Sequence, residues 1–199
     1  MVKVLVASRN QGKVRELEQV LRELNIEGVE LVSLHDAPSY PDPVEDGLTF
    51  VDNALLKARA GAKATGLPCV ADDSGLTVKA LNGMPGILSA RWSGNHGDDQ
   101  SNNDLLLAQM ADIDERAAAF VSCCALATPD GQEFTAEGRW EGELLRDPRG
   151  ENGFGYDPLF QPADGGGRSS AELSAEEKNA HSHRGKALRA LAPHIAALK

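Results

Sequence analysis

Residues 2–24, VKVLVASRNQGKVRELEQVLREL, change from one hydrophobic period to another within a few positions. Val2–Ala7 is an almost uninterrupted apolar run, which predicts a buried β-strand. From Lys13 onward the apolar side chains recur at helical spacing, at Val14, Leu17, Leu21 and Leu24. This spacing predicts an amphipathic helix that begins near Lys13. The short polar loop between the two elements predicts a strand-to-helix turn.

Further strands and helices follow without regular alternation. Apolar and alternating runs predict strands at 29–34, 69–71, 76–81, 117–128 and 132–144, the last two joined in a hairpin by Pro129-Asp130-Gly131. Capping residues and helical spacing predict helices at 49–65, where Thr49 is the N-cap and Asp52 holds the reciprocal capping position, at 98–111 and from Ser174 onward, where Glu177 completes a capping box. Mixed elements of this kind indicate an α/β or α+β fold. The 199 residues, 1–199, fit one domain, with or without two lobes.

The composition argues against several classes of partner. A net charge of −10 disfavours polymeric nucleic acid, whose binding proteins carry basic patches, but a few local cations can still hold a nucleotide. The odd number of cysteines, Cys69, Cys123 and Cys124, argues against a disulfide framework and predicts a reducing, cytoplasmic setting. No run approaches the ~20 apolar residues of a membrane span, so we expect no membrane partner.

The loop after the first strand has the features of a phosphate cradle. It supplies six candidate contacts, Ser8, Arg9, Asn10, Gln11, Gly12 and Lys13. A helix N-terminus offers free N–H groups and a partial positive charge, and Lys13 adds a full charge. The loop is not a Walker A motif, because Ala7 and Val14 stand where glycine and Ser or Thr are required. The alternative is a capped turn with a surface lysine.

Two adjacent carboxylates, Asp72 and Asp73, follow a short apolar strand, with Ser74 and Gly75 after them. We expect them in a turn between two strands. Adjacent acids repel, and a bound cation relieves the repulsion. Mg²⁺ prefers hard carboxylate oxygens and takes only one or two of them from a protein, which predicts a magnesium site. The alternative is an acidic β-turn without a ligand.

The segment GFGYDP, 153–158, places aromatic rings and a carboxylate among glycines. Its candidate contacts are Phe154, Gly155, Tyr156 and Asp157. This pattern suits a flat ligand that stacks on a ring while the backbone comes close to it. The alternative is an aromatic plug of the core beside a tight turn.

Three donors, Lys178, His183 and Arg184, cluster near the start of the last helical region. Lys and Arg side chains only donate, so they suit a carbonyl oxygen of a ligand. The alternative is a solvated helix face. Taken together, the phosphate, acidic and aromatic segments suggest a pocket for a base, a metal and a phosphate chain.

Six motifs occur in order along the chain: SRNQGKVREL, EDGLTFVDNALLKA, ADDSGL, GMPGILSARWSG, GENGFGYDPLF and ELSAEEKNAHSHRGKAL. With them the sequence resembles, from end to end, the inosine triphosphate pyrophosphatase family, which includes the bacterial dITP/XTP diphosphatases. Several ordered motifs are far more specific than any single one. Arg9 departs from the family pattern, in which a small residue is more usual, and could add a phosphate contact.

The resemblance implies an α/β fold with two lobes, a long mixed central sheet flanked by helices and an active site in the groove between the lobes. It also implies a homodimer and dependence on Mg²⁺. By the same resemblance, Ser8–Lys13 hold the triphosphate, and Asp73 is the catalytic acid/base residue and a metal ligand. Glu45 and Asp72 are further candidate metal ligands.

The resemblance extends to the base. Ser74 contacts the substrate, Phe154–Asp157 and Lys178 bind the nucleotide, and His183 and Arg184 face the base. The implied reaction is hydrolysis of ITP, dITP or XTP to a monophosphate and pyrophosphate, which cleanses the nucleotide pool. A donor-only site suits a 6-oxo purine and leaves the 6-amino group of ATP unpaired.

Two other interpretations stay open. The Maf-like nucleotide pyrophosphatases share the architecture and act on other bases, but they lack the combination of Phe154–Asp157 with His183 and Arg184. A non-catalytic nucleotide sensor is the second, and the intact acidic pair beside an intact phosphate loop argues against it.

Overall fold

The computed structural model describes residues 1–198. The strands are β1 (Val2–Val6), β2 (Val29–Ser33), β3 (Cys69–Val78), β4 (Ala117–Ala127), β5 (Glu133–Leu144) and β6 (Phe160–Pro162). The α-helices are α1 (Gln11–Glu23), α2 (Phe50–Thr65), α3 (Asp99–Gln109), α4 (Ala175–His181) and α5 (His183–Ala196). Short 3₁₀ helices occupy 79–81, 86–91, 157–159 and 170–172.

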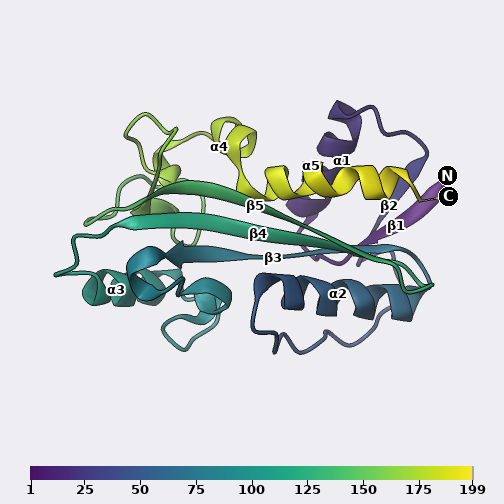
Figure 1. The fold of residues 1–199 in the computed structure, drawn as a ribbon, viewed down its shortest axis with the longest axis horizontal. Coiled ribbons are helices and arrows are strands. Elements are labelled where there is room, and N and C mark those ends of the chain that lie inside the picture. Colours follow the sequence, from purple (N-terminus) through teal and green to yellow (C-terminus); the bar gives the residue numbers. More distant parts are fainter. Residues whose placement is uncertain (199) are drawn as a thin grey trace. The chain divides into compact units, whose positions relative to one another are not determined.

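The strands form one sheet in the order β2-β1-β3-β4-β5-β6. β1 runs parallel to β2, with Val2 opposite Val29, and parallel to β3, with Leu5 opposite Cys69. β6 pairs antiparallel with β5. The sheet is therefore mixed and flanked by helices, which confirms the predicted α/β class (Figure 1).

The chain divides into two compact units, and the division passes through β3, β4 and β5. The first unit contains residues 1–73, 122–138 and the segment from Arg184 onward. The second unit contains residues 74–121 and 139–183. Each unit has its own buried core, so each can be described by itself.

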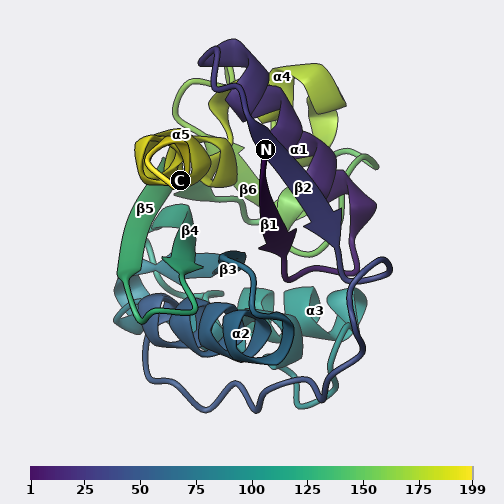
Figure 2. The same ribbon diagram turned by 90° about the vertical axis from the view of Figure 1, so that its right-hand side faces the viewer.

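The first unit has helices on both faces of its strands (Figure 2). One face packs against α1 and α5, through a core that includes Leu17 and Leu191. The other face packs against α2, where Ala54, Ala58 and Ala62 recur every fourth residue. These small side chains let the helix lie close to the sheet. The predicted Thr49–Asp52 capping box starts α2, and Gly66 in the left-handed conformation ends it.

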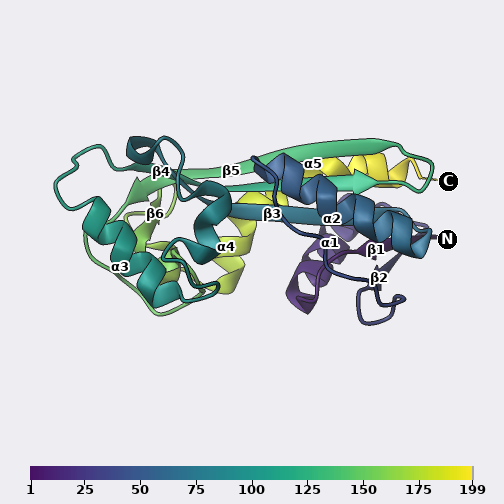
Figure 3. The same cartoon turned by 90° about the horizontal axis from the view of Figure 1, so that it is seen from below.

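The core of the second unit is built on large side chains. Trp140 and Phe160 are fully buried and meet edge to face, with ring centroids 5.6 Å apart. Helix α3 covers this core on the side seen in Figure 3; it contributes Leu106, and its C-cap residue Met110 is also part of the core. The predicted Ser174–Glu177 capping box is present at the start of α4.

The sequence prediction is wrong at the acidic segment. Asp72, Asp73, Ser74 and Gly75 lie inside the continuous strand β3 and form no turn. β3 lies between β1 and β4, and its backbone stays extended. Gly75 is needed for packing, because a Cβ there would clash with the carbonyl of Gly86 and with Ser89. The Ser-Gly pair therefore marks a close approach of two segments.

Two smaller predictions also need correction. The strand predicted at 76–81 ends at Val78, and a 3₁₀ turn follows it. Leu24 lies beyond the end of α1 and is exposed, because the helix stops at Glu23. No helix among residues 1–198 combines the length and the apolar character that crossing a bilayer requires.

Candidate functional site

The phosphate-type loop in the first unit joins β1 to α1. Asn10 is the N-cap, and its side chain accepts a hydrogen bond of 2.8 Å from the Gly12 N–H. Ser8 Oγ accepts a hydrogen bond of 3.1 Å from the Asn10 N–H. The helix begins at Gln11, two residues earlier than predicted, so Lys13 lies in its first turn. The partial positive charge of the helix N-terminus and the full charge of Lys13 therefore lie at the same end of α1.

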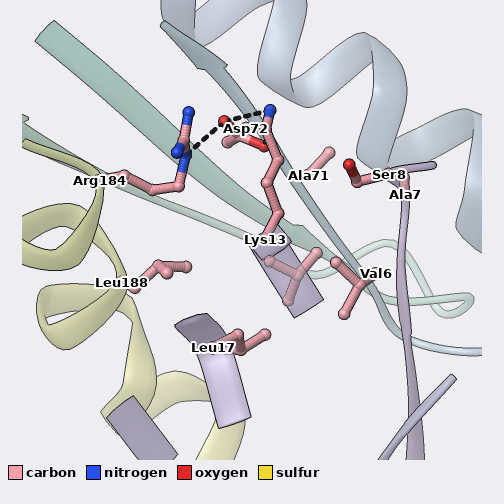
Figure 4. A pocket seen from close by; sticks show the side chains of 10 residues that line it. Val6, Ala7, Ser8, Lys13, Leu17, Ala71, Asp72, Arg184 and Leu188 are labelled. Atoms are coloured by element: carbon pink, nitrogen blue, oxygen red, sulfur yellow. Dashed lines mark hydrogen bonds and ion pairs between the residues drawn. The ribbon is translucent and has the colours of Figure 1, made fainter. Parts of the chain in front are cut away.

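Lys13 is not a surface lysine, because its ammonium group is held by Asp72. Lys13 Nζ lies 2.8 Å from both carboxylate oxygens of Asp72. Arg184, the second residue of α5, donates from Nε to Asp72 Oδ2 at 3.1 Å. Figure 4 shows the two cations converging on this carboxylate. The alternative of a solvated helix face is therefore excluded for Arg184, whose side chain is only 18% exposed.

The two cations decide the charge state of Asp72. Burial alone would raise its pKa, but Lys13 and Arg184 outweigh burial and hold the pKa well below its usual range. Arg184 NH1 also lies 3.5 Å from Glu16 Oε2, so its guanidinium is held between two carboxylates. Asp72 is therefore charged at neutral pH and fixes the positions of both cations.

Asp73 has different surroundings, because successive side chains of a strand point to opposite faces. Its neighbours come from α2, where Asn53 Nδ2 donates to Asp73 Oδ2 at 3.1 Å. Lys57 Nζ lies 3.5 Å from Asp73 Oδ1 and 3.2 Å from Glu45 Oε2. Burial raises the pKa of Asp73, and Lys57 and Asn53 offset only part of that effect.

A pocket of about 310 Å³ lies beside these groups in the first unit. Its polar lining consists of Ser8, Arg9, Lys13, Tyr40, Asp42, Glu45, Lys57 and Asp72. Arg9 reaches Asp42 through two hydrogen bonds of 2.8 and 3.1 Å. Both side chains are exposed, so water screens this pair and a phosphate could replace the carboxylate.

A smaller cavity, of about 10 Å³, lies under Lys13 and Arg184 and is lined mainly by apolar side chains such as Leu17 and Leu188 (Figure 4). No group of three or more His, Cys, Asp or Glu side chains within residues 1–198 surrounds a common metal position. The converging acids that the structure does provide are Glu45 and Asp73, on either side of Lys57.

In the second unit, the two aromatic side chains of the segment 153–157 have different surroundings. Phe154 is 71% exposed, whereas Tyr156 is 5% exposed and donates from its hydroxyl to the Ser89 carbonyl at 2.8 Å. The core-plug alternative therefore holds for Tyr156 and fails for Phe154. Gly153 and Gly155 have φ angles of 79° and 60°, which glycine adopts without strain.

Asp157 holds this loop from inside. It is 1% exposed, accepts a 2.9 Å hydrogen bond from the Phe154 N–H and one of 2.8 Å from Ser170 Oγ. Lys178 is ion-paired with Asp157, and its Nζ lies 5.1 Å from the centroid of the Phe154 ring. Lys178 is therefore also not part of a solvated helix face.

The remaining predicted residues lie on the same elements. His183 begins α5, and its ring stacks on Phe120 with centroids 5.3 Å apart. Ser74 follows Asp73 in β3 and is half-buried. The predicted residues thus form two groups, one around Lys13 and Asp73 in the first unit and one around Phe154 and Lys178 in the second.

Sequence reasoning missed several residues that contact the predicted ones. Asn53 and Lys57 are four positions apart on α2 and share a helix face, which is a signal that could have been read. Tyr40, whose pKa is raised to about 12 mainly by burial, carried no such signal, since it lies in an irregular loop.

Comparison with known proteins covers almost the whole chain. A family model described as the Ham1 family matches residues 4–194. A dITP/XTP pyrophosphatase of Corynebacterium efficiens is 66% identical over 204 residues, covering 99% of both chains. The crystal structure of a nucleoside-triphosphatase / dITP/XTP pyrophosphatase from Mycobacterium abscessus is 61% identical, covers 98% of this chain and 100% of that one, and has a TM-score of 0.83. A HAM1 protein structure from Coxiella burnetii is 41% identical over the full length of both chains, with a TM-score of 0.90.

Proposed function

Because the chain belongs to the Ham1 family, we propose that it hydrolyses non-standard purine nucleoside triphosphates, dITP, XTP and ITP, to the monophosphate and pyrophosphate. The observation that carries the proposal is the end-to-end likeness to proteins named dITP/XTP pyrophosphatase, including one at 66% identity. This agrees with the family resemblance of the sequence motifs. Such an activity would remove altered purines from the nucleotide pool.

The phosphate chain is assigned to the loop Ser8–Lys13. The N–H groups of the first turn of α1 face an anion favourably, and Lys13 adds a charge that Asp72 keeps in position. Arg9 exchanges Asp42 for a phosphate oxygen. These residues would bind the pyrophosphate portion and stabilise it as it leaves.

Glu45 and Asp73 fit a magnesium ion, since both carboxylates already converge on the positive charge of Lys57. Mg²⁺ needs only one or two protein carboxylates when phosphate oxygens and water complete its shell. Asp72 is a weaker candidate, because its oxygens already accept from Lys13 and Arg184. When bound, the ion would neutralise phosphate charge and lower the pKa of a coordinated water.

Asp73 is assigned as the residue that orients and activates the attacking water. Its raised pKa brings the carboxylate closer to the proton affinity that a general base needs, and Asn53 fixes its orientation. The water oxygen bonds to the α-phosphorus as its proton passes toward Asp73. The bond from the α-phosphorus to the bridging oxygen breaks, and pyrophosphate leaves with that oxygen.

The base is assigned to the second group of residues. Phe154 offers an exposed ring for stacking, and Lys178 beside it adds a donor. Gly155, Tyr156 and Asp157 shape the loop, and Ser74 contacts the substrate. By the family resemblance, His183 of this group and Arg184 of the first group supply donors for a 6-oxo group. Such donors would disfavour ATP because its 6-amino group also donates.

The test is pyrophosphate release from a panel of nucleotides with Mg²⁺. We expect ITP, dITP and XTP to be hydrolysed far faster than ATP, and chelation of the metal to stop the reaction. Preference for modified pyrimidines or other bases would favour the Maf-like alternative. Tight binding of ITP without any turnover would identify a sensor.

We further propose a homodimer, as the family resemblance implies, and a cytoplasmic location, as the cysteines indicate. The three cysteines are free and buried, which suits a reducing compartment. Sedimentation equilibrium measures the assembly directly, and a mass equal to one chain over a broad concentration range would refute the dimer.

A further inference from the structure

The loop 153–157 must be rigid if Phe154 is to stack on a base, yet its own composition favours mobility. Two of its five residues are glycines in left-handed conformations, and the Phe154 ring has little packing because it is 71% exposed. Glycine restricts the backbone least. The restraint must therefore come from hydrogen bonds made by the backbone of the loop.

Helix α3 supplies two of these bonds. The Gly155 N–H donates to Asp99 Oδ2 at 2.7 Å, and the Gly155 carbonyl accepts from Asn103 Nδ2 at 2.9 Å. Asp99 and Asn103 are four residues apart and share one face of α3. The two peptide groups on either side of the Gly155 Cα are thus both tied to one rigid helix.

The hydrogen bond that Asp99 accepts from the Gly155 N–H is charge-assisted and therefore stronger than a bond between neutral groups, since the acceptor is a carboxylate. Asn103 is 9% exposed, and a buried amide cannot replace a lost partner with bulk water. On the far side of Gly155, the hydroxyl of Tyr156 is fixed to Ser89. Phe154 is therefore the one position of the loop whose side chain projects outward from a fully anchored backbone.

We propose that Asp99 and Asn103 are positioning residues for the nucleobase, which set the orientation of the Phe154 ring through Gly155 without touching the nucleotide. The inference rests on the proposed function, because it assumes that Phe154 stacks on a purine. It adds α3 to the elements that determine substrate affinity.

The experiment uses the full-length protein with both Asp99→Ala and Asn103→Ala, the double variant, and compares it with the wild type. It measures kcat and KM for ITP and the inhibition constant of inorganic pyrophosphate. Pyrophosphate lacks a base, so its binding does not depend on Phe154. We expect KM for ITP to rise about tenfold while the inhibition constant stays within about twofold of wild type. Asp99→Asn, which keeps an acceptor oxygen, should restore most of the affinity.

Coupling to the ring is tested by a double-mutant cycle. In a Phe154→Ala background, the same two substitutions should change KM by less than about twofold, because the ring they position is gone. Asp104→Ala is the matched control, since the Asp104 side chain accepts a hydrogen bond from Gln100 of the same helix and does not bond to the loop 153–157. Asp99 is exposed, so Asp99→Ala alone provides the same test if the double variant does not fold.

The inference would be overturned by an unchanged KM for ITP, by full additivity with Phe154→Ala, or by a loss of pyrophosphate binding as large as the loss of ITP affinity. In each of these cases hydrolysis of ITP by the wild type would leave the proposed function intact. A wild type that hydrolyses no purine triphosphate would overturn the proposed function and this inference together.

Discussion

Asp72 and Asp73 are adjacent in the chain but have opposite electrostatic surroundings. Asp72 meets Lys13 and Arg184, which lower its pKa, whereas burial raises the pKa of Asp73. A strand makes this separation possible, because it turns neighbouring side chains to different faces. One acid is thereby suited to hold cations in place and the other to exchange a proton.

Asp73→Asn should abolish turnover while the protein folds and still binds nucleotide. Asparagine keeps the size of the side chain but cannot accept a proton, and it weakens a proposed metal contact. Steady-state kinetics and isothermal titration with ITP measure the two effects. Asp46→Asn, an exposed acid in the loop before α2, is the control. Retention of more than about a tenth of wild-type turnover, a loss below ~1.4 kcal/mol, would refute the role.

Lys13→Ala should destabilise the protein at neutral pH, and this cost should shrink as the pH falls and Asp72 becomes protonated. The folded pKa of Asp72 is lowered, so its stabilising contribution is present above the unfolded pKa of about 3.9 and is lost as pH falls through the folded value. Removing Lys13 raises the folded pKa toward the unfolded value, so Asp72 contributes less stability at neutral pH and less of it is lost on acidification. At neutral pH we expect a cost of about 1–3 kcal/mol.

Thermal unfolding of the wild type and of Lys13→Ala between about pH 7 and pH 3 measures how this cost changes with pH. Lys3→Ala is the matched control, because the Lys3 side chain forms an exposed ion pair with Glu30 and no other ion pair within residues 1–198. Identical pH profiles for the two variants would show that Lys13 does not set the charge of Asp72.

At the scale of elements, the candidate site depends on where helices begin. α1 presents Lys13 in its first turn, and α5 presents Arg184 in its first turn, so both cations meet the same strand residue. The loop 153–157 contains no α-helix or strand and is held by α3, Ser89 and Ser170. Rigid elements thus position side chains that lie at helix starts and in a loop.

Arg184→Ala and Phe154→Ala should have different effects on base preference. Loss of a charged donor for the 6-oxo group should lower the preference for ITP over ATP by ~10- to 100-fold. Loss of the Phe154 ring should lower kcat/KM for all purine nucleotides by similar factors, since stacking does not distinguish the 6-position. The ratio of kcat/KM for ITP and ATP is the measurement.

Arg189→Ala is the control for α5, because Arg189 pairs with Glu23 at the surface. If Arg184→Ala lowers hydrolysis of ITP and ATP equally, Arg184 acts on phosphate or on Asp72, and discrimination between bases lies elsewhere.

At the scale of the whole molecule, the two units share three strands. β3, β4 and β5 each contribute residues to both units, so neither unit can lose its strands without disrupting the backbone of the other. The single domain for 1–199 stays a prediction, which cooperative unfolding of both units would test.

Leu191→Ala in the first core and Leu159→Ala in the second should therefore lower the same unfolding transition. Both leucines are fully buried, and each truncation should cost about 2–5 kcal/mol. Calorimetry distinguishes one transition from two. A variant in which one transition moves while a second stays at the wild-type temperature would show that the units unfold independently.

Local features were readable in the sequence because they depend on residues a few positions apart. The two capping boxes, the periodicity of α1 and the hairpin between β4 and β5 are all of this kind, and all are confirmed. The ordered motifs also identified the family correctly. Long-range contacts were not readable. Lys13 and Asp72 are 59 residues apart, and Arg184 and Asp72 are 112 apart.

Packing alone settled three further points: that the acidic pair lies in a strand, that Phe154 is exposed while Tyr156 is buried, and that α3 holds Gly155. The physical reason is that exposure and partner choice depend on which distant segments cover a residue. Residue type and spacing limit the chemistry available at a position, but the folded chain determines which groups meet there.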